Sequence, residues 1–380
     1  MNQPYCLAPF YHQHISSDGS SRPCCAWWFD TAFKGDPLDY WTSDFLLELQ
    51  AAMLAGTPPE GCRVCTRDTA LGVKVGQRHV RNEEAAMIGY DISQGPVLLG
   101  QEIDISNVCN LRCRMCSSSR STKWQADELA MGISPVKLLH SGWRLDSSLA
   151  STIKALTFLG GEPMLHQDEI ADALELIDDH GRLGEIRVTM TTNCTKLLTD
   201  RLYGLLQRCN TVHLSVSIDA LGIANDYIRS DSHWADIETN LRDIDRICGD
   251  IPHWSYMVTS AVSVLNVNIL PELWDWLFAN LRNSPPKSAA TISWWPHHLS
   301  AFNVNESAKT VITERYAKVL ERMPLQEQIV DTICRYIATP PKKAEADFKQ
   351  EFWQITNQLD NLRGTDFRIV NPEMAAWLDN

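Results

Sequence analysis

Three cysteines, Cys109, Cys113 and Cys116, stand at the spacing C-x3-C-x2-C and are well placed to do chemistry. They follow segment 101–106, whose alternation of apolar and polar residues predicts a strand. Three thiolates on so short a loop can bind three irons of a cubane cluster and leave the fourth iron open for a ligand. A zinc site is the alternative, because three cysteines could also be three of the four ligands of a zinc ion.

In this spacing the chain resembles the radical S-adenosylmethionine (SAM) enzymes, whose signature is the same three-cysteine loop. The resemblance implies that Cys109, Cys113 and Cys116 hold a 4Fe–4S cluster and that SAM chelates its open iron. One electron from the cluster would then cleave SAM to methionine and a 5′-deoxyadenosyl radical, which removes a hydrogen atom from the substrate. Met115, within the loop, is expected to contact SAM.

Polar motifs follow the later predicted strands at their carboxyl ends, where barrel proteins place their ligand sites. The resemblance implies that the motif Gly160, Gly161, Glu162 and Pro163 contacts the amino group of SAM, although Gly–Gly alone also fits an ordinary turn. Asn193, Ser217 and Asp219 would make polar contacts with the ribose or methionine part of SAM. Arg229 would bind the SAM carboxylate, and Val264 would pack against the adenine.

Several of these residues also have simpler interpretations. Asn193 fits a helix cap, Asp219 fits a turn, and Val264 fits an ordinary core position. No residue can be assigned from the sequence as the catalytic acid, base or radical partner.

A second group of cysteines lies in the first 65 residues, where Cys62 and Cys65 form a C-x2-C pair typical of metal sites. A turn signal at Asp18-Gly19 predicts a hairpin of segments 11–15 and 22–28, and segment 42–54 is predicted to be a helix. This order resembles the twitch domain, a shortened SPASM domain of radical SAM enzymes, although in most relatives that domain follows the core. The resemblance implies an auxiliary 4Fe–4S cluster on Cys6, Cys24, Cys62 and Cys65, with Cys25 as a substitute for Cys24 and zinc as the alternative metal.

Alternating strand and helix patterns from residue 100 to about 300 predict an α/β fold with a parallel sheet. Six such units match the partial (β/α)6 TIM-like barrel of radical SAM enzymes. The expected strands are 101–106, 154–159, 185–191, 211–218, 256–264 and 290–295, and the expected helices are 121–131, 167–180, 197–208, 234–248, 270–281 and 307–323. The expected organisation is a twitch-like Fe–S domain at 1–66, a linker at 67–99, the core at 100–300 and a helical extension at 301–380 with helices near 342–362 and 372–378.

The composition narrows the class of protein. A net charge of −13 argues against non-specific adhesion to nucleic acid or to an anionic membrane, because both require a basic surface. No apolar run reaches membrane-spanning length, so no membrane partner is expected. Twelve cysteines without a visible secretory signal indicate metal or redox use and a cytoplasmic location.

Together, the residues and the resemblance predict a radical SAM enzyme that modifies a peptide or amino-acid-type group, or another small molecule. A donor such as flavodoxin or ferredoxin would supply the electron. One alternative is radical modification or rearrangement of a nucleobase, or of an amino acid attached to it, in DNA or RNA, for example in hypermodified phage DNA. The other is a zinc-binding interaction protein without enzymatic activity. The reaction subclass, whether oxidoreductase, isomerase or transferase, stays open.

Overall fold

The computed structural model describes residues 5–28, 31–73, 76–283, 289–292, 296–340 and 344–379. The chain forms two compact units, each assembled from several stretches of sequence. The first unit comprises Met1–Val108, Leu138–Thr191 and Leu198–Leu214, and the second comprises Cys109–Lys137, Thr192–Leu197 and Ser215–Asn380. These units cut across the segments expected from the sequence, so the domain boundaries at residues 66, 99 and 300 stay a prediction.

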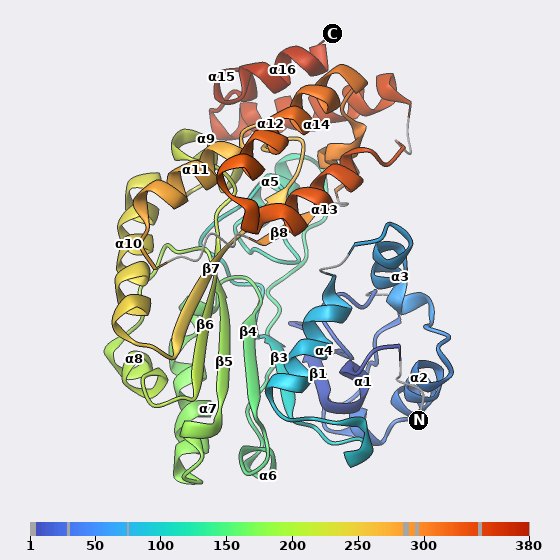
Figure 1. Cartoon of the computed structure of the whole chain (residues 1–380), viewed down its shortest axis with the longest axis vertical. Coiled ribbons are helices and arrows are strands. Elements are labelled where there is room, and N and C mark those ends of the chain that lie inside the picture. Colours follow the sequence, from blue (N-terminus) through green and yellow to red (C-terminus); the bar gives the residue numbers. More distant parts are fainter. Residues whose placement is uncertain are drawn as a thin grey trace. The chain divides into compact units, whose positions relative to one another are not determined.

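Eight strands form one sheet in the order β2-β1-β3-β4-β5-β6-β7-β8 (Figure 1). β1 is antiparallel to β2, whereas the pairs β1–β3, β3–β4, β4–β5 and β7–β8 are parallel. From β3 onward, the order in the sheet follows the order in the chain, as repeated βα units require. The strands are β1 (His12–Ile15), β2 (Ser21–Arg22), β3 (Gly100–Asp104), β4 (Ala155–Leu159), β5 (Arg187–Thr192), β6 (Thr211–Ser217), β7 (Trp254–Val262) and β8 (Ala289–Ile292).

Helices alternate with these strands, which confirms the predicted α/β fold of repeated βα units. In α7, Ile170, Leu174 and Ile177 are buried at helical spacing, so this helix packs through one apolar face. The sixth predicted strand is β8, and residues 293–295 of that prediction lie outside the described residues. The helices are α5 (Trp124–Ala130), α6 (Ser147–Ala150), α7 (Gln167–Asp179), α8 (Asp200–Leu206), α9 (Gly222–Ile228), α10 (Trp234–Asp250), α11 (Leu270–Asn280) and α12 (Glu306–Arg322).

The N-terminal hairpin differs from its prediction in two respects. Its second strand was expected over 22–28, but β2 ends at Arg22, because Pro23 has no N–H to donate to a strand ladder. The hairpin also joins the main sheet, since β1 pairs with β3 in parallel and His14 lies opposite Glu102. The hairpin that lies between Cys6 and Cys24 in the sequence therefore belongs to the same sheet as β3.

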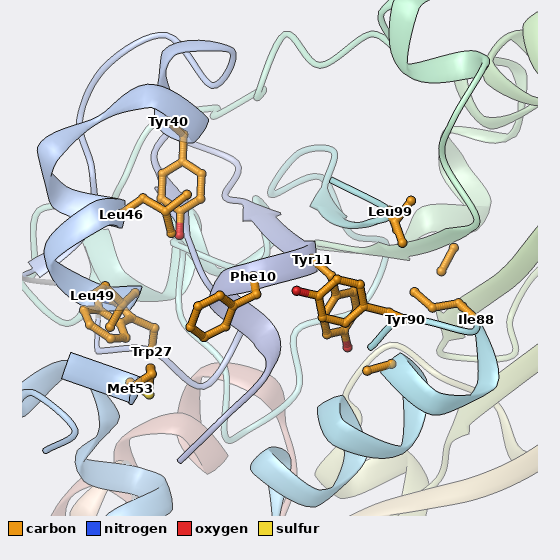
Figure 2. Packing of buried hydrophobic residues seen from close by; sticks show 12 residues of the cluster. Phe10, Tyr11, Trp27, Tyr40, Leu46, Leu49, Met53, Ile88, Tyr90 and Leu99 are labelled. Atoms are coloured by element: carbon orange, nitrogen blue, oxygen red, sulfur yellow. The ribbon is translucent and has the colours of Figure 1, made fainter. Parts of the chain in front are cut away.

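A hydrophobic cluster packs the N-terminal helices of the first unit against this hairpin (Figure 2). Helix α2 (Asp44–Ala55) begins where the Ser43 side chain accepts a hydrogen bond from the Leu46 amide, and it ends at Gly56 in the left-handed conformation. Cys6, Cys24 and Cys62 are partly buried against the cluster. Its labelled members are Phe10, Tyr11, Trp27, Tyr40, Leu46, Leu49, Met53, Ile88, Tyr90 and Leu99.

A buried ionic network ties helix α4 (Gln77–Met87) to β1 and β3 within the first unit. The Arg81 guanidinium donates to Glu102 at 2.8 Å, to Glu84 at 2.7 Å and to His12 Nε2 at 2.9 Å. His14 Nδ1 lies 3.1 Å from the other Glu102 oxygen. Charges removed from water need such partners, so these residues must fold together.

The C-terminal helices belong to the second unit. The predicted helix near 342–362 is α14 (Glu345–Arg363), and the last predicted helix is α16 (Pro372–Asp379). Between them lies α15 (Phe367–Val370), and α13 (Glu327–Ile337), which was not predicted, packs against the edge strand β8. Covering an edge strand prevents pairing with other chains. Among the described residues, no helix combines the length and the apolar character needed to cross a membrane.

Candidate functional site

Two backbone hydrogen bonds fasten the cysteine loop to the end of α9. The Arg112 amide donates to the Ser230 carbonyl at 3.1 Å, and the Arg114 amide donates to the Ile228 carbonyl at 2.8 Å. The Cys116 amide donates to the Cys113 carbonyl at 2.9 Å, which closes a turn between these two cysteines. Because Arg229 lies between the two accepting residues, this pairing brings its side chain to Cys113.

Nitrogen donors surround the sulfur atoms of the loop. Arg229 Nη1 lies 4.0 Å from Cys113 Sγ, whereas the Leu111 amide and Asn193 Nδ2 lie 3.4 Å and 3.8 Å from Cys109 Sγ. A hydrogen bond from Cys116 and the positive charge of Arg229 lower the pKa of Cys113 despite its burial. Thiolates ligate iron, and hydrogen bonds to sulfur tune the potential of iron–sulfur clusters. The donor set of this loop therefore fits a cluster.

Asp219 orients Arg229. Its carboxylate is completely buried, and Oδ2 lies 2.8 Å from Arg229 Nε. The other oxygen, Oδ1, accepts from the Ala261 amide at 2.7 Å, while the Asp219 amide donates to Asn225 Oδ1 at 3.1 Å. Burial lowers the pKa of Arg229, but Asp219 and the nearby cysteines more than offset it and raise the pKa above its usual value. Arg229 is therefore a cation at any physiological pH.

Asn193 directly follows β5 and connects that strand end to the cysteine loop. Its Oδ1 accepts from the Thr195 amide at 3.0 Å and from the Thr195 hydroxyl at 2.6 Å, so the side chain closes a local turn and not the helix cap that the sequence allowed as an alternative. Its Nδ2 donates to Asn110 Oδ1 at 2.9 Å, and Asn110 Nδ2 donates in turn to Thr195. The sequence analysis missed Asn110 and Thr195, which hold Asn193 in place.

Gly160 and Gly161 are required by close packing of the backbone. A Cβ on Gly161 would lie 2.1 Å from the Val108 carbonyl oxygen, and one on Gly160 would lie 2.6 Å from that of Ser106. Gly160 also has φ +118°, a conformation that side chains rarely adopt. The Gly161 amide donates to Ser106 and the Glu162 amide to Val108, so this motif is pinned to the segment that enters the cysteine loop.

The remaining predicted SAM contacts have varied surroundings. Glu162 is 2% exposed and accepts a hydrogen bond from the Met164 amide at 3.1 Å, next to Pro163, which is also buried. Ser217 is the last residue of β6, and Met115 lies half-buried in the loop. Val264 is fully buried two residues after β7. The role of each residue toward SAM stays a prediction.

Cys6, Cys24, Cys62 and Cys65 line a single pocket of the first unit. Burial, together with a smaller effect of the negative charge of Cys65, raises the pKa of Cys6 to about 11. Burial and the thiols of Cys6 and Cys65 likewise raise the pKa of Cys62 to about 12. Gly61 permits this arrangement, because a Cβ there would lie 2.2 Å from the Trp27 ring.

Cys25 has a different environment from Cys24. Its amide donates to Glu102 Oε2 at 3.0 Å, and burial together with Glu102 raises the pKa of its thiol far above the usual value. Cys25 is not one of the residues that line the cysteine pocket. It lies instead beside the buried ionic network.

Two ion pairs within the second unit tie the cysteine loop and its neighbouring helix to α14. Arg114 lies 3.6 Å from the centre of the Tyr227 ring and donates to Asp360, and both charged groups are buried. Arg363 donates to Asp127 at 2.7 Å. The sequence analysis missed these pairs, because the partners are 246 and 236 residues apart and no local pattern marks them.

Residues 103–247 match the model of the Radical SAM superfamily. The chain is similar to the GTP 3′,8-cyclase of Nitrobacter hamburgensis, with 25% identity over 178 residues, which are 46% of this chain and 48% of the relative. It is also similar to the GTP 3′,8-cyclase of Corynebacterium glutamicum, with 26% identity over 131 residues, 33% of this chain and 32% of the relative.

The chain thus spans half or less of these curated relatives. Among solved structures, it is similar to native anSMEcpe with bound AdoMet, with 16% identity, a TM-score of 0.42, and coverage of 60% of this chain and 63% of the other.

Proposed function

We propose that this radical SAM enzyme reductively cleaves SAM at a 4Fe–4S cluster held by Cys109, Cys113 and Cys116, and that the resulting radical removes a hydrogen atom from its substrate. The observation that carries this proposal is the Arg229 cation beside the Cys113 sulfur, held there by Asp219. When bound, the cluster and SAM would supply the electron transfer and the radical. The described residues position the thiolates, surround them with N–H donors and exclude water from Cys113, which is 7% exposed.

The predicted SAM contacts divide into two roles under this proposal. Arg229 would bind the SAM carboxylate, for which a guanidinium is well suited, while the buried Asp219 would position Arg229 instead of contacting SAM directly. Glu162 would accept from the SAM amino group with its remaining acceptor capacity. Asn193, Ser217, Met115 and Val264 remain proposed contacts with the rest of the molecule.

A second 4Fe–4S cluster on Cys6, Cys24, Cys62 and Cys65 forms part of the proposal. The shared pocket supports it, because four thiolates around one cavity can satisfy all four irons of a cluster. The raised pKa values of these thiols are those of the cavity without a metal, and positive iron would favour their thiolate forms. Zinc remains the alternative metal, and the ratio of iron and sulfide to zinc distinguishes the two.

Two substrate classes are proposed, and one observation favours the second. A peptide or amino-acid-type group follows from the resemblance to enzymes with auxiliary-cluster domains. A purine nucleotide or nucleobase is favoured by the similarity to two GTP 3′,8-cyclases. For either substrate, a reduced flavodoxin or ferredoxin is the proposed electron donor.

The test is anaerobic turnover of the reconstituted full chain. The reduced protein is incubated with SAM and with either peptide or nucleotide fractions from an extract of cells grown in deuterated medium. Mass spectrometry then follows deuterium into 5′-deoxyadenosine, and the fraction that transfers deuterium identifies the substrate class. Replacing Cys109, Cys113 and Cys116 together by Ala should abolish 5′-deoxyadenosine, whereas Cys248→Ala, at a cysteine isolated in the sequence, should leave it unchanged. Unchanged SAM cleavage in the triple variant would refute the proposed cluster.

A further inference from the structure

Two histidines and a glutamate of the first unit meet outside the cysteine sites. His140 lies in the loop before α6, His166 directly precedes α7, and Glu169 lies in the first turn of α7. One ligand atom from each of the three residues lies within 4.8 Å of those of the other two. His166 Nδ1 is 2.9 Å from Glu169 Oε1, and His140 Nε2 is 3.3 Å from Glu169 Oε2.

We propose that His140, His166 and Glu169 form a binding site for a divalent transition-metal ion, with zinc as the reference ion. Two imidazoles and one carboxylate are the ligands that such ions prefer. Ligand atoms around a tetrahedral zinc ion are about 3.4 Å apart, close to the separations from Glu169 to each histidine. Three protein ligands leave at least one position open for water or an anionic ligand.

Ser106 gives His166 the second partner that a metal-binding histidine needs. Its hydroxyl lies 2.7 Å from His166 Nε2 and also accepts from the Val108 amide at 3.0 Å. Without a metal, the Glu169 carboxylate can only accept, so His166 carries its proton on Nδ1 and Nε2 accepts from Ser106. With a metal on Nδ1, the proton moves to Nε2 and the same hydroxyl accepts it. Both tautomers are thus satisfied in one side-chain position.

Apart from the contacts of Glu169 with the two histidines, which the metal would replace, two interactions compete with the metal, and both are at the surface. Arg144 Nη1 lies 3.1 Å from Glu169 Oε2, but its side chain is 63% exposed, and such a pair contributes only about 0.2–1 kcal/mol. The Gly142 amide donates to His140 Nδ1 at 3.1 Å, which places the His140 proton on Nε2 in the metal-free protein. Metal binding through Nε2 would move the His140 proton to Nδ1, which could then no longer accept this exposed hydrogen bond from Gly142. Neither competitor is buried, so the metal can displace both.

The test is the zinc stoichiometry of the full chain after its iron–sulfur clusters have been reconstituted, measured by equilibrium dialysis against Zn²⁺ alone. We expect one Zn²⁺ per chain in the wild type and none in the double variant His140→Ala/His166→Ala, with the iron content equal in both. His180→Ala is the matched control, because His180 is exposed at the opposite end of α7 and should retain the zinc. Arg144→Ala should bind zinc about two- to fivefold more tightly, because it removes the competing cation.

A second readout guards against misfolding of the double variant. Zinc should raise the thermal unfolding midpoint of the wild type and of His180→Ala, but not that of the double variant, since an ion that binds the folded state stabilises it. If the wild type binds no zinc at 100 times the concentration of the protein, or if the double variant binds as much as the wild type, the site does not exist. Neither result depends on SAM cleavage, so failure here is distinct from failure of the proposed function.

Discussion

Arg229 and Asp219 form an ion pair with 2.8 Å between Nε and Oδ2, and the same guanidinium extends Nη1 to within 4.0 Å of the Cys113 sulfur. Asp219 is fully buried, so its role is to hold the arginine and to accept from the Ala261 amide of β7. Asp219, which lies two residues after β6, is in this way coupled to the cysteine loop.

Asp219→Asn should destabilise the fold and weaken SAM binding. The change leaves the Arg229 charge, which is 11% exposed, without its counter-charge, and breaking a buried pair costs about 3–5 kcal/mol. We expect the free energy of unfolding, measured in urea, to fall by at least about 2 kcal/mol. Equilibrium dialysis should show a SAM affinity reduced at least about tenfold, since one misplaced charge-assisted contact costs about 1.4 kcal/mol or more. The control is Glu238→Gln, which breaks the exposed pair with Arg242 and should cost less than about 1 kcal/mol.

Gly161→Ala should disrupt the entry to the cysteine loop. The new Cβ would lie 2.1 Å from the Val108 carbonyl oxygen, which is backbone and cannot move aside as a side chain would. Overpacking of this kind costs about 1–3 kcal/mol or more, and we expect iron incorporation at Cys109, Cys113 and Cys116 to fall with it. Gly204→Ala is the matched control, because Gly204 lies within α8 and its Cβ would meet nothing within 4 Å. That change should leave iron content intact and stabilise the helix by up to about 1 kcal/mol.

Cys24→Ala should lower the iron content, whereas Cys25→Ala should leave it unchanged. Cys24 lines the pocket with Cys6, Cys62 and Cys65, whereas Cys25 lies beside Glu102. In a background with Cys109, Cys113 and Cys116 replaced by Ala, we expect Cys24→Ala to lose iron, because one iron of the N-terminal cluster would then have neither a thiolate nor SAM as its ligand, and Cys25→Ala to keep all four irons. Iron and sulfide analysis measures both. Loss of iron in Cys25→Ala alone would show that Cys25 is the ligand, and zinc in place of iron and sulfide would exclude the auxiliary cluster.

His12 should make the first unit sensitive to mild acid. Burial and the Arg81 charge lower the pKa of His12 to about 4, and Arg81 donates to its Nε2 while Nδ1 faces the Pro23 carbonyl. The unfolded chain therefore takes up a proton near pH 6.5, where folded His12 does not. Its contribution to stability is complete above pH 6.5 and is lost as pH falls toward about 4.

The measurement is the free energy of unfolding of wild type and His12→Gln between pH 7.5 and pH 4.5. The advantage of the wild type over the variant should shrink by about 1.4 kcal/mol for each pH unit below 6.5. His14 acts in the opposite sense, because Asp104 and Glu102 raise its pKa against the effect of burial, so its contribution is present at low pH and lost as pH rises. The comparison with His12→Gln isolates the His12 term, and a constant difference across this range would contradict it.

Local patterns in the sequence determined the repeated βα units, the cysteine loop and the polar residues that follow each strand. These features depend on neighbours a few residues apart: alternation in β5, helical spacing in α7, and C-x3-C-x2-C in the loop. Strand ends were therefore predicted to within a few residues. The second hairpin strand was predicted wrongly over 22–28, because that prediction ignored Pro23, which has no N–H to donate to a strand ladder.

Only the tertiary structure decided which partner each charged or polar residue has. The Arg114–Asp360 pair joins residues 246 positions apart, and His14 meets Glu102 through the parallel pairing of β1 with β3. The distinction between Cys24 and Cys25 also depends on which thiol faces the pocket, and two adjacent cysteines look equivalent in sequence. Burial makes such partners obligatory for a charge, but it does not mark them along the chain, since any of many carboxylates could satisfy a given arginine.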